Sequence, residues 1–342
     1  MRHGGHIPNR RGKTLQRRYL RGAQGPPRRQ RSARAPSCFA AIAIAMFCGG
    51  LAQAPSGPGD GQPPNNAPAP AFRLDVNLIL VHATVLDRAG RIVSGLSKRD
   101  FQLFVDGAPK SISSFEPEDA PVAAGIVVDN SVSMANKGSE VIAASLAFAR
   151  ASNPRDEMFV VHFSNQARLG LPPDKPFTDS IPELEKALSR FSAEGTTALY
   201  DAIALAVRHC RKSRLERKVL LVISDGGDNS SKQTLDEVLK LAQSAGVVIY
   251  CIGIYDEANR DRNPGVLTQI AEVTGGQAYF PSALEEVTAT CLKIAREIRQ
   301  QYTLGFKGKE DGGYHSIKVI AKRPDLGPLD VRARSGYFAS SR

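Results

Sequence analysis

Short apolar runs alternate with segments whose apolar residues recur at helical spacing, from residue 122 to about residue 300. Such alternation is typical of an α/β fold with a mostly parallel, doubly wound, Rossmann-like sheet that carries helices on both faces. The short element at 167–170 is predicted to be an antiparallel edge strand. We predict strands at 122–129, 158–163, 167–170, 219–225, 247–254 and 277–280, and helices at 140–151, 181–190, 199–212, 234–245, 266–274 and 284–300.

Polar residues directly follow two of these apolar strands. Asp129-Asn130-Ser131-Val132-Ser133 comes after the first strand, and Asp225-Gly226-Gly227 comes after a later one. In open α/β sheets, ligands bind at the carboxyl ends of the strands. Hydroxyl and carboxylate oxygens suit Mg²⁺, Mn²⁺ or Ca²⁺ rather than zinc. A strand-end aspartate can also serve only as a turn residue, so each motif alone is weak.

A third segment, Gly195-Thr196-Thr197, precedes a predicted helix, where a threonine hydroxyl can cap the helix or bind a metal ion. In this order, D-x-S-x-S, G-T-T-A-L-Y-D-A and S-D-G resemble the von Willebrand factor type A (VWFA) domain and its metal-ion-dependent adhesion site. The resemblance implies the five metal ligands Asp129, Ser131, Ser133, Thr197 and Asp225, with Thr196 as an adjacent alternative.

The resemblance also implies how such a site works. The hydroxyl oxygens would bind Mg²⁺ directly, with Mn²⁺ and Ca²⁺ as alternative ions, and the two aspartates would hold the ion largely through ordered water. One coordination position would then remain for the carboxylate of an Asp or Glu on a partner protein. Apart from Glu194, just ahead of the threonine loop, no His, Lys, Cys or Glu lies within two positions of a predicted ligand.

We therefore predict a protein-binding module without enzymatic activity. Two alternatives stay open at this point. The chain could be a structural scaffold protein of the cell envelope with a vestigial metal site, or a metal-dependent hydrolase that uses the same ion.

Short β-type segments flank the α/β region at 72–118 and 301–338. They are predicted to pair with each other, so that a VWFA domain at 119–300 is inserted in a small β-sandwich. Asp106-Gly107 indicates a hairpin, with 111–115 as its return strand. The motifs D-F-x-L-x-x-D-G at 100–107 and R-x-G-Y at 334–337 resemble the acidobacterial VWFA-related family of exported proteins.

The net charge of +11 comes from the amino-terminal segment alone. Residues 1–52 hold 11 of the 45 basic residues and no acidic one, so the remaining 34 basic residues balance the 34 acidic ones. This distribution argues against a nucleic-acid-binding face. We predict a signal peptide with a long basic n-region at 1–54, a disordered Pro/Gly-rich linker at 55–71, and a secreted or periplasmic protein. Contact with a membrane is expected only through an uncleaved signal anchor.

Overall fold

The structure, a computed structural model, describes residues 77–190, 192–255 and 262–340, which belong to one compact unit, Ala71–Arg342. The predicted signal peptide at 1–54 and linker at 55–71 lie outside the described residues. Within the described ranges, no helix combines the length and the apolar character that a membrane crossing requires.

The centre of the α/β part is a six-stranded sheet in the order β10-β9-β8-β5-β6-β7. All neighbours in this sheet are parallel except β7, which runs antiparallel to β6 at the edge. This confirms the predicted sheet and its antiparallel edge strand. The strands are β5 (Val122–Asp129), β6 (Glu157–Phe163), β7 (Ala167–Leu169), β8 (Arg217–Ser224), β9 (Val247–Gly253) and β10 (Ala278–Tyr279).

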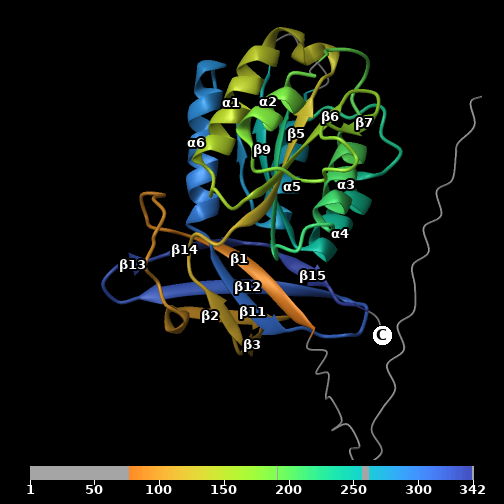
Figure 1. Cartoon of the computed structure of the whole chain (residues 1–342). Coiled ribbons are helices and arrows are strands. Elements are labelled where there is room, and N and C mark those ends of the chain that lie inside the picture. The colour runs from red at the N-terminus through yellow and green to blue at the C-terminus, as the bar shows by residue number, and fades with distance from the viewer. Residues whose placement is uncertain (1–76, 191, 256–261, 341–342) are drawn as a thin grey trace, which may run out of the picture. The chain divides into compact units, whose positions relative to one another are not determined.

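Helices cover both faces of this sheet (Figure 1). On one face α1 packs against α2 and α6, and on the other α4 packs against α3 and α5. They are α1 (Gly138–Ala151), α2 (Ile181–Leu188), α3 (Leu199–Cys210), α4 (Leu235–Ala245), α5 (Pro264–Thr274) and α6 (Glu285–Arg299). Every predicted helix is present, with ends within two residues of the predicted ones. The 3₁₀ helix η2 (Val132–Lys137) was not predicted.

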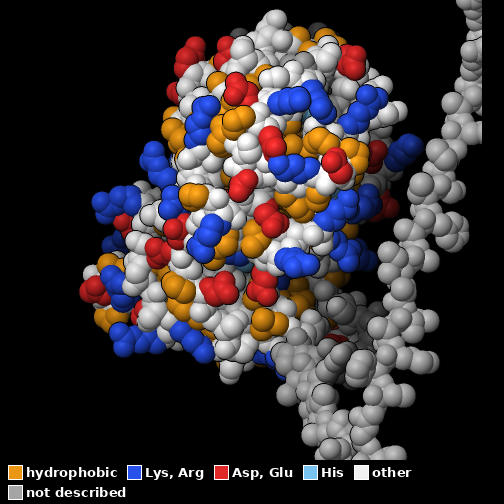
Figure 2. All heavy atoms as spheres, in the orientation of Figure 1, with side chains coloured by type: hydrophobic (Ala, Val, Ile, Leu, Met, Phe, Trp, Pro, Cys, Tyr) orange, Lys and Arg blue, Asp and Glu red, His pale blue; other side chains and the backbone are white. Residues whose placement is uncertain are grey.

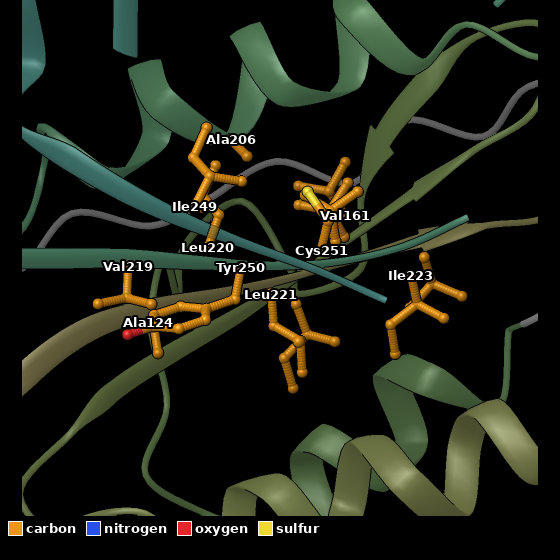
Figure 3. Packing of buried hydrophobic residues seen from close by; sticks show 14 of the residues in the cluster. Ala124, Val161, Ala206, Val219, Leu220, Leu221, Ile223, Ile249, Tyr250 and Cys251 are labelled. Atoms are coloured by element: carbon orange, nitrogen blue, oxygen red, sulfur yellow. The ribbon is translucent and has the colours of Figure 1, made fainter. Parts of the chain in front are cut away.

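The central strands are apolar along their whole length because helices bury them from both sides. All eight residues of β5 are buried, and Figure 3 shows side chains of β8 and β9 filling the space beside it. Gly125 lies in the middle of β5 because a Cβ there would stand 2.4 Å from Cζ of Phe159. Cys210, Cys251 and Cys291 are free and buried in this core.

The flanking segments form two antiparallel sheets that share one hydrophobic core. One sheet has the order β14-β1-β11-β4, and the other has the order β13-β12-β2-β3 with β15 also paired to β12. Strands from before and after the α/β part pair directly, β1 with β11 and β2 with β12, which confirms the predicted insertion. The strands are β1 (Leu78–Leu86), β2 (Phe101–Val105), β3 (Ala108–Lys110), β4 (Ser114–Glu116), β11 (Tyr302–Lys307), β12 (Tyr314–Arg323), β13 (Gly327–Pro328), β14 (Asp330–Ala333) and β15 (Gly336–Phe338), and the 3₁₀ helix η1 (Lys98–Asp100) precedes β2.

One prediction about the flanking hairpin is wrong. Asp106 and Gly107 do form the turn, with φ of 50° and 77°, as a two-residue hairpin loop requires. The return strand is β3, which follows at once, and not 111–115. The chain leaves the hairpin after Lys110, and Ser114–Glu116 pairs with β11 in the other sheet instead.

Arg217, the first residue of β8, joins the two parts of the fold. Its side chain is buried, and its guanidinium donates to the carbonyl oxygens of Ala120 (2.9 Å) and Ile298 (2.7 Å) and to Oε1 of Gln301 (3.4 Å). Ala120 lies just before β5 and Gln301 just before β11. The Arg217 side chain therefore contacts both segments that connect the β-sandwich to the α/β part, the one before β5 and the one before β11.

A second polar cluster ties the β2–β3 turn to β12. His315 places Nδ1 2.8 Å from Asp106 and Nε2 2.8 Å from Asp311, so both ring nitrogens face carboxylate oxygens. Lys309 also donates to Asp106, at 2.9 Å. The hydrogen bonds with Asp311 and then Asp106 raise the pKa of His315 above its ordinary value.

This cluster predicts a pH-dependent contribution to stability. A histidine whose pKa is raised on folding stabilises the fold fully below its unfolded pKa of about 6.5, and the contribution is lost as the pH rises through the folded value. We expect His315→Gln to lower the free energy of unfolding most at pH 5.5 and least at pH 9, measured by urea denaturation. Asp325→Asn, which removes a surface carboxylate paired with Arg323, is the control. A loss of the same size at both pH values would contradict this account.

Candidate metal-binding site

The predicted ligand loops meet because their strands are neighbours. β5 and β8 lie side by side and parallel, with Val128 of β5 opposite Ile223 of β8. Asp129 ends β5, and Asp225 directly follows β8, so the two carboxylates reach the same edge of the sheet. Both residues are buried, Asp129 at 0% and Asp225 at 2% exposure. The fold thus places at one edge two carboxylates that are almost 100 residues apart in sequence.

Ser131 and Ser133, in the loop after β5 that we call the serine loop, connect these carboxylates. The Oγ atoms of Ser131 and Ser133 share a hydrogen bond of 3.0 Å, and the Ser133 hydroxyl donates to Oδ2 of Asp225 at 2.6 Å. Asp129 accepts from the backbone N–H of Ser131 at 2.9 Å and from the Ser224 hydroxyl at 2.5 Å. The structure therefore brings four of the five predicted ligands into one hydrogen-bonded group.

Thr197, the fifth predicted ligand, is held beside the group through its backbone. Its N–H donates to Oδ1 of Asn229 (2.9 Å), and its carbonyl accepts from the N–H groups of Asn229 (3.0 Å) and Ser230 (3.1 Å), in the loop that follows Asp225. Thr197 is 7% exposed, whereas the exposed Thr196 accepts a hydrogen bond from the Ser230 hydroxyl. These hydrogen bonds of Thr197 involve its backbone and not its hydroxyl, so the role of the hydroxyl as a ligand stays a prediction.

The electrostatics of the group favour a cation. Burial, and to a smaller extent the charge of Asp225, raise the pKa of Asp129 to about 6, against the hydrogen bonds from Ser131 and Ser224. A nearby positive charge would remove this penalty on the ionised carboxylate. Across the described ranges, no three His, Cys, Asp or Glu side chains gather in a way that could hold a metal ion. The candidate site instead combines two carboxylates with hydroxyl oxygens, a donor set that fits a hard cation.

Sequence reasoning missed two residues of this site. Lys137, at the end of η2, is 3% exposed and donates from Nζ to the carbonyl of Ser133 at 3.1 Å. Ser224 supports Asp129 and also accepts from the N–H of Gly226 at 3.1 Å. The sequence offered no signal for Lys137, because only the unpredicted turn of η2 returns it to the serine loop. Ser224 was visible as the serine of the S-D-G motif.

The loop after Asp225 is tied to the start of α3. Oδ1 of Asp228 accepts from the N–H of Tyr200 (3.2 Å) and from the Ser231 hydroxyl (2.6 Å). In return, Asp201 of α3 accepts from the N–H groups of Lys232 and Gln233, both at 3.1 Å. These hydrogen bonds hold the start of α3, which follows Thr197, against the loop that follows Asp225. None of them uses a side chain of a predicted ligand.

Comparison with known proteins agrees with the motifs. A family model of the von Willebrand factor type A domain matches residues 125–292. Subunit 2 of ATP-dependent DNA helicase II from Coccidioides immitis is 24% identical over an alignment of 190 residues that covers 50% of this chain and 25% of that protein. The chain thus spans about a quarter of the length of this curated relative.

Two solved structures are also similar to the chain. A von Willebrand factor type A protein from Catenulispora acidiphila aligns with a TM-score of 0.48 and 15% identity, over 71% of this chain and 74% of that one. Proximal thread matrix protein 1 from the mussel byssus, solved with a zinc-occupied MIDAS motif, aligns with a TM-score of 0.45 and 16% identity, over 53% and 48%.

Proposed function

We propose that the region matched by the family model of the von Willebrand factor type A domain, a protein-interaction module, binds an acidic residue of a partner protein through a divalent cation. The observation that carries the proposal is the convergence of Ser131, Ser133 and Asp225 beside the buried Asp129. These oxygens come from two separate loops and form one compact donor group. Neutral hydroxyl ligands would leave the cation electrophilic enough to attract a further carboxylate.

The proposed ion is Mg²⁺, with Mn²⁺ and Ca²⁺ as alternatives. Ser131, Ser133 and Thr197 would supply neutral oxygens, and Asp129 and Asp225 would supply the negative charge. When bound, the ion provides a Lewis-acidic position for an oxygen of the partner. The chain's own residues orient the donors: Ser224 and the Ser131 N–H fix Asp129, and Lys137 fixes the carbonyl of Ser133.

We infer that the module is not an enzyme. A hydrolase that used this ion would need a base or a nucleophile poised beside it. Lys137, which could otherwise serve as a base, is engaged with the carbonyl of Ser133. We also propose that the protein is exported, on the basis of the signal-peptide pattern of residues 1–54.

Capture of partners with and without the cation tests this function. Full-length protein is incubated with envelope fractions of the source cells in Mg²⁺ or in EDTA and then crosslinked, and it is expected to capture a partner in Mg²⁺ but not in EDTA. Ser133→Ala should lose the partner, because it removes the hydroxyl that donates to Asp225. The matched control, Ser139→Ala, changes an exposed serine of α1 and should retain it. Capture unaffected by EDTA would refute a cation-dependent role, and Mg²⁺-dependent hydrolysis of a phosphoester would refute the non-enzymatic one.

A further inference from the structure

A hollow of about 240 Å³ lies beside the candidate metal site. We call it the side pocket. One of its lining residues is Asn130, which stands between the predicted ligands Asp129 and Ser131 in the sequence. The volume is suited to a single side chain. Its lining residues are Asn130, His162, Phe163, Ser164, Asn165, Gln166, Arg168, Leu169, Gly170, Arg190, Ser192 and Glu194.

Backbone hydrogen bonds between three loops preform the walls of the side pocket. The N–H of Asn130 donates to the carbonyl of Phe163 (2.6 Å), and the N–H of Glu194 donates to the carbonyl of Asn130 (2.8 Å). The N–H of Ala198 donates to the carbonyl of Ser164 at 2.7 Å. The loops that follow β5 and β6 and the loop that precedes α3 are therefore joined, and a ligand would not have to order them.

The polar groups at the base of the side pocket are already paired and uncharged. Nε2 of His162 lies 2.9 Å from the carbonyl of Ala187, so this nitrogen carries the proton. Burial, together with the charge of Arg190, lowers the pKa of His162, which keeps the ring neutral. The side-chain amide of Asn130 is assigned the orientation in which its nitrogen donates to the carbonyl of Val128 (3.3 Å) and its oxygen accepts from the N–H of Ser192 (3.2 Å).

The charge of the side pocket therefore comes from its rim. Arg168 of β7 lies opposite His162 in the strand register, and no ion pair among the described residues involves it. Arg190 donates one N–H to the carbonyl of Gly170 at 2.9 Å, which places its guanidinium at the wall. Glu194 is the acidic residue of the lining. Two guanidinium groups against one carboxylate favour an anionic side chain.

We propose that the partner presents two acidic side chains, one for the cation and a second that enters the side pocket and pairs with Arg168 and Arg190. This inference rests on the proposed function, because the first acid anchors the second. We expect Arg168 to determine most of the preference for the second acid. The carboxylate of Glu194 reduces this preference, because it repels a second acid. A partner with a single acidic residue would bind the cation but would leave the side pocket empty.

Synthetic peptides test this preference with the full-length protein. A set of Gly/Ser nonapeptides carries one fixed Glu and a second Glu at each other position, and matched peptides carry Gln there. Fluorescence anisotropy is measured in Mg²⁺ and in EDTA. The best two-acid peptide is expected to bind about 1.5- to 5-fold more tightly than its single-acid match, the range for one exposed charge pair.

Variants of the rim assign the effect. Arg168→Gln should weaken the preference without changing binding of single-acid peptides, because only Arg190 then remains to pair with the second acid, and Glu194→Gln should increase the preference. The matched control is Arg150→Gln, which changes an exposed arginine of α1 and should leave the preference for two acids unchanged. Equal, Mg²⁺-dependent binding of both peptide types to the wild type would overturn the second-acid inference and leave the proposed function standing. No Mg²⁺-dependent binding of any peptide would overturn both.

Discussion

Replacing Asp129 with asparagine should weaken Mg²⁺ binding by roughly 10- to 100-fold and, at the same time, stabilise the metal-free fold. The first effect follows because one of the two carboxylates at the site becomes neutral. The second follows because the ionised Asp129 is fully buried, and burial raises its pKa from 3.8 to about 6. A shift of this size corresponds to about 3 kcal/mol of destabilisation when the group is ionised. Since asparagine pairs less well with its neighbours, we expect a net gain of about 1 to 3 kcal/mol.

The sign of this effect can be checked against pH. A carboxyl group whose pKa is raised on folding binds protons more tightly in the folded state, so metal-free wild type should lose stability as the pH rises from about 4 through 6. Above that window the whole penalty is present, and the advantage of Asp129→Asn should be largest. Urea denaturation at pH 7.5, without and with Mg²⁺, measures both effects, because a ligand that binds only the folded state stabilises it.

The control for Asp129→Asn is Asp236→Asn, which removes the same charge from an exposed position in the first turn of α4. This variant should keep the stabilisation by Mg²⁺ that the wild type shows. If Mg²⁺ stabilised Asp129→Asn as strongly as the wild type, the carboxylate at the end of β5 would have no part in cation binding. If the metal-free variant were much less stable than the wild type, the burial penalty assigned to Asp129 would be wrong.

Arg217→Met should lower the free energy of unfolding by roughly 3 to 5 kcal/mol. Methionine is apolar and cannot donate a hydrogen bond. Three acceptors would therefore lose their hydrogen bonds from the buried guanidinium: the carbonyl oxygens of Ala120 and Ile298 and the amide oxygen of Gln301. Each buried acceptor left without a donor costs about 1 to 3 kcal/mol, and some of them will find water. Because the lost contacts join the two parts of the fold, we also expect the single unfolding transition to broaden or divide.

Urea denaturation followed by circular dichroism measures this loss. Arg214→Met, which changes an exposed arginine three residues away, should alter the unfolding free energy by less than about 0.5 kcal/mol. Arg217→Lys should fall in between, because an ammonium group cannot reproduce the planar fork of N–H groups. A loss of under 1 kcal/mol for Arg217→Met would show that the hydrogen bonds of Arg217 between the two parts of the fold contribute little to stability.

Much of the fold could be predicted because burial of the sheet on both faces leaves a clear pattern. Continuous apolar strands such as β5 and amphipathic helices such as α4 each produce a distinct periodicity. The pairing of strands before and after the α/β part followed from the same patterning. The serine and aspartate loops were identifiable because each directly follows an apolar strand, and the structure brings Asp129, Ser131, Ser133 and Asp225 together.

What could not be predicted depends on contacts between distant parts of the chain. Residues 111–115 alternate like a strand, but the tight Asp106-Gly107 turn places β3 directly after it, and the next strand pairs elsewhere. Lys137 and Arg217 look like ordinary surface residues in sequence, yet both are buried and donate to backbone carbonyls. Local periodicity carries no information about such partners. The side pocket could not be predicted for the same reason, since its lining comes from three separate segments.

The most direct test of the central claim is a crystal of the full-length protein grown with Mn²⁺ and measured for anomalous scattering. We expect one anomalous peak at the carboxyl end of β5, roughly 2.0–2.6 Å from the hydroxyl oxygens of Ser131 and Ser133, with Asp129 and Asp225 beside it. Absence of a peak there at saturating Mn²⁺, with the Ser133 hydroxyl still bonded to Asp225, would contradict the claim that these oxygens form a cation site.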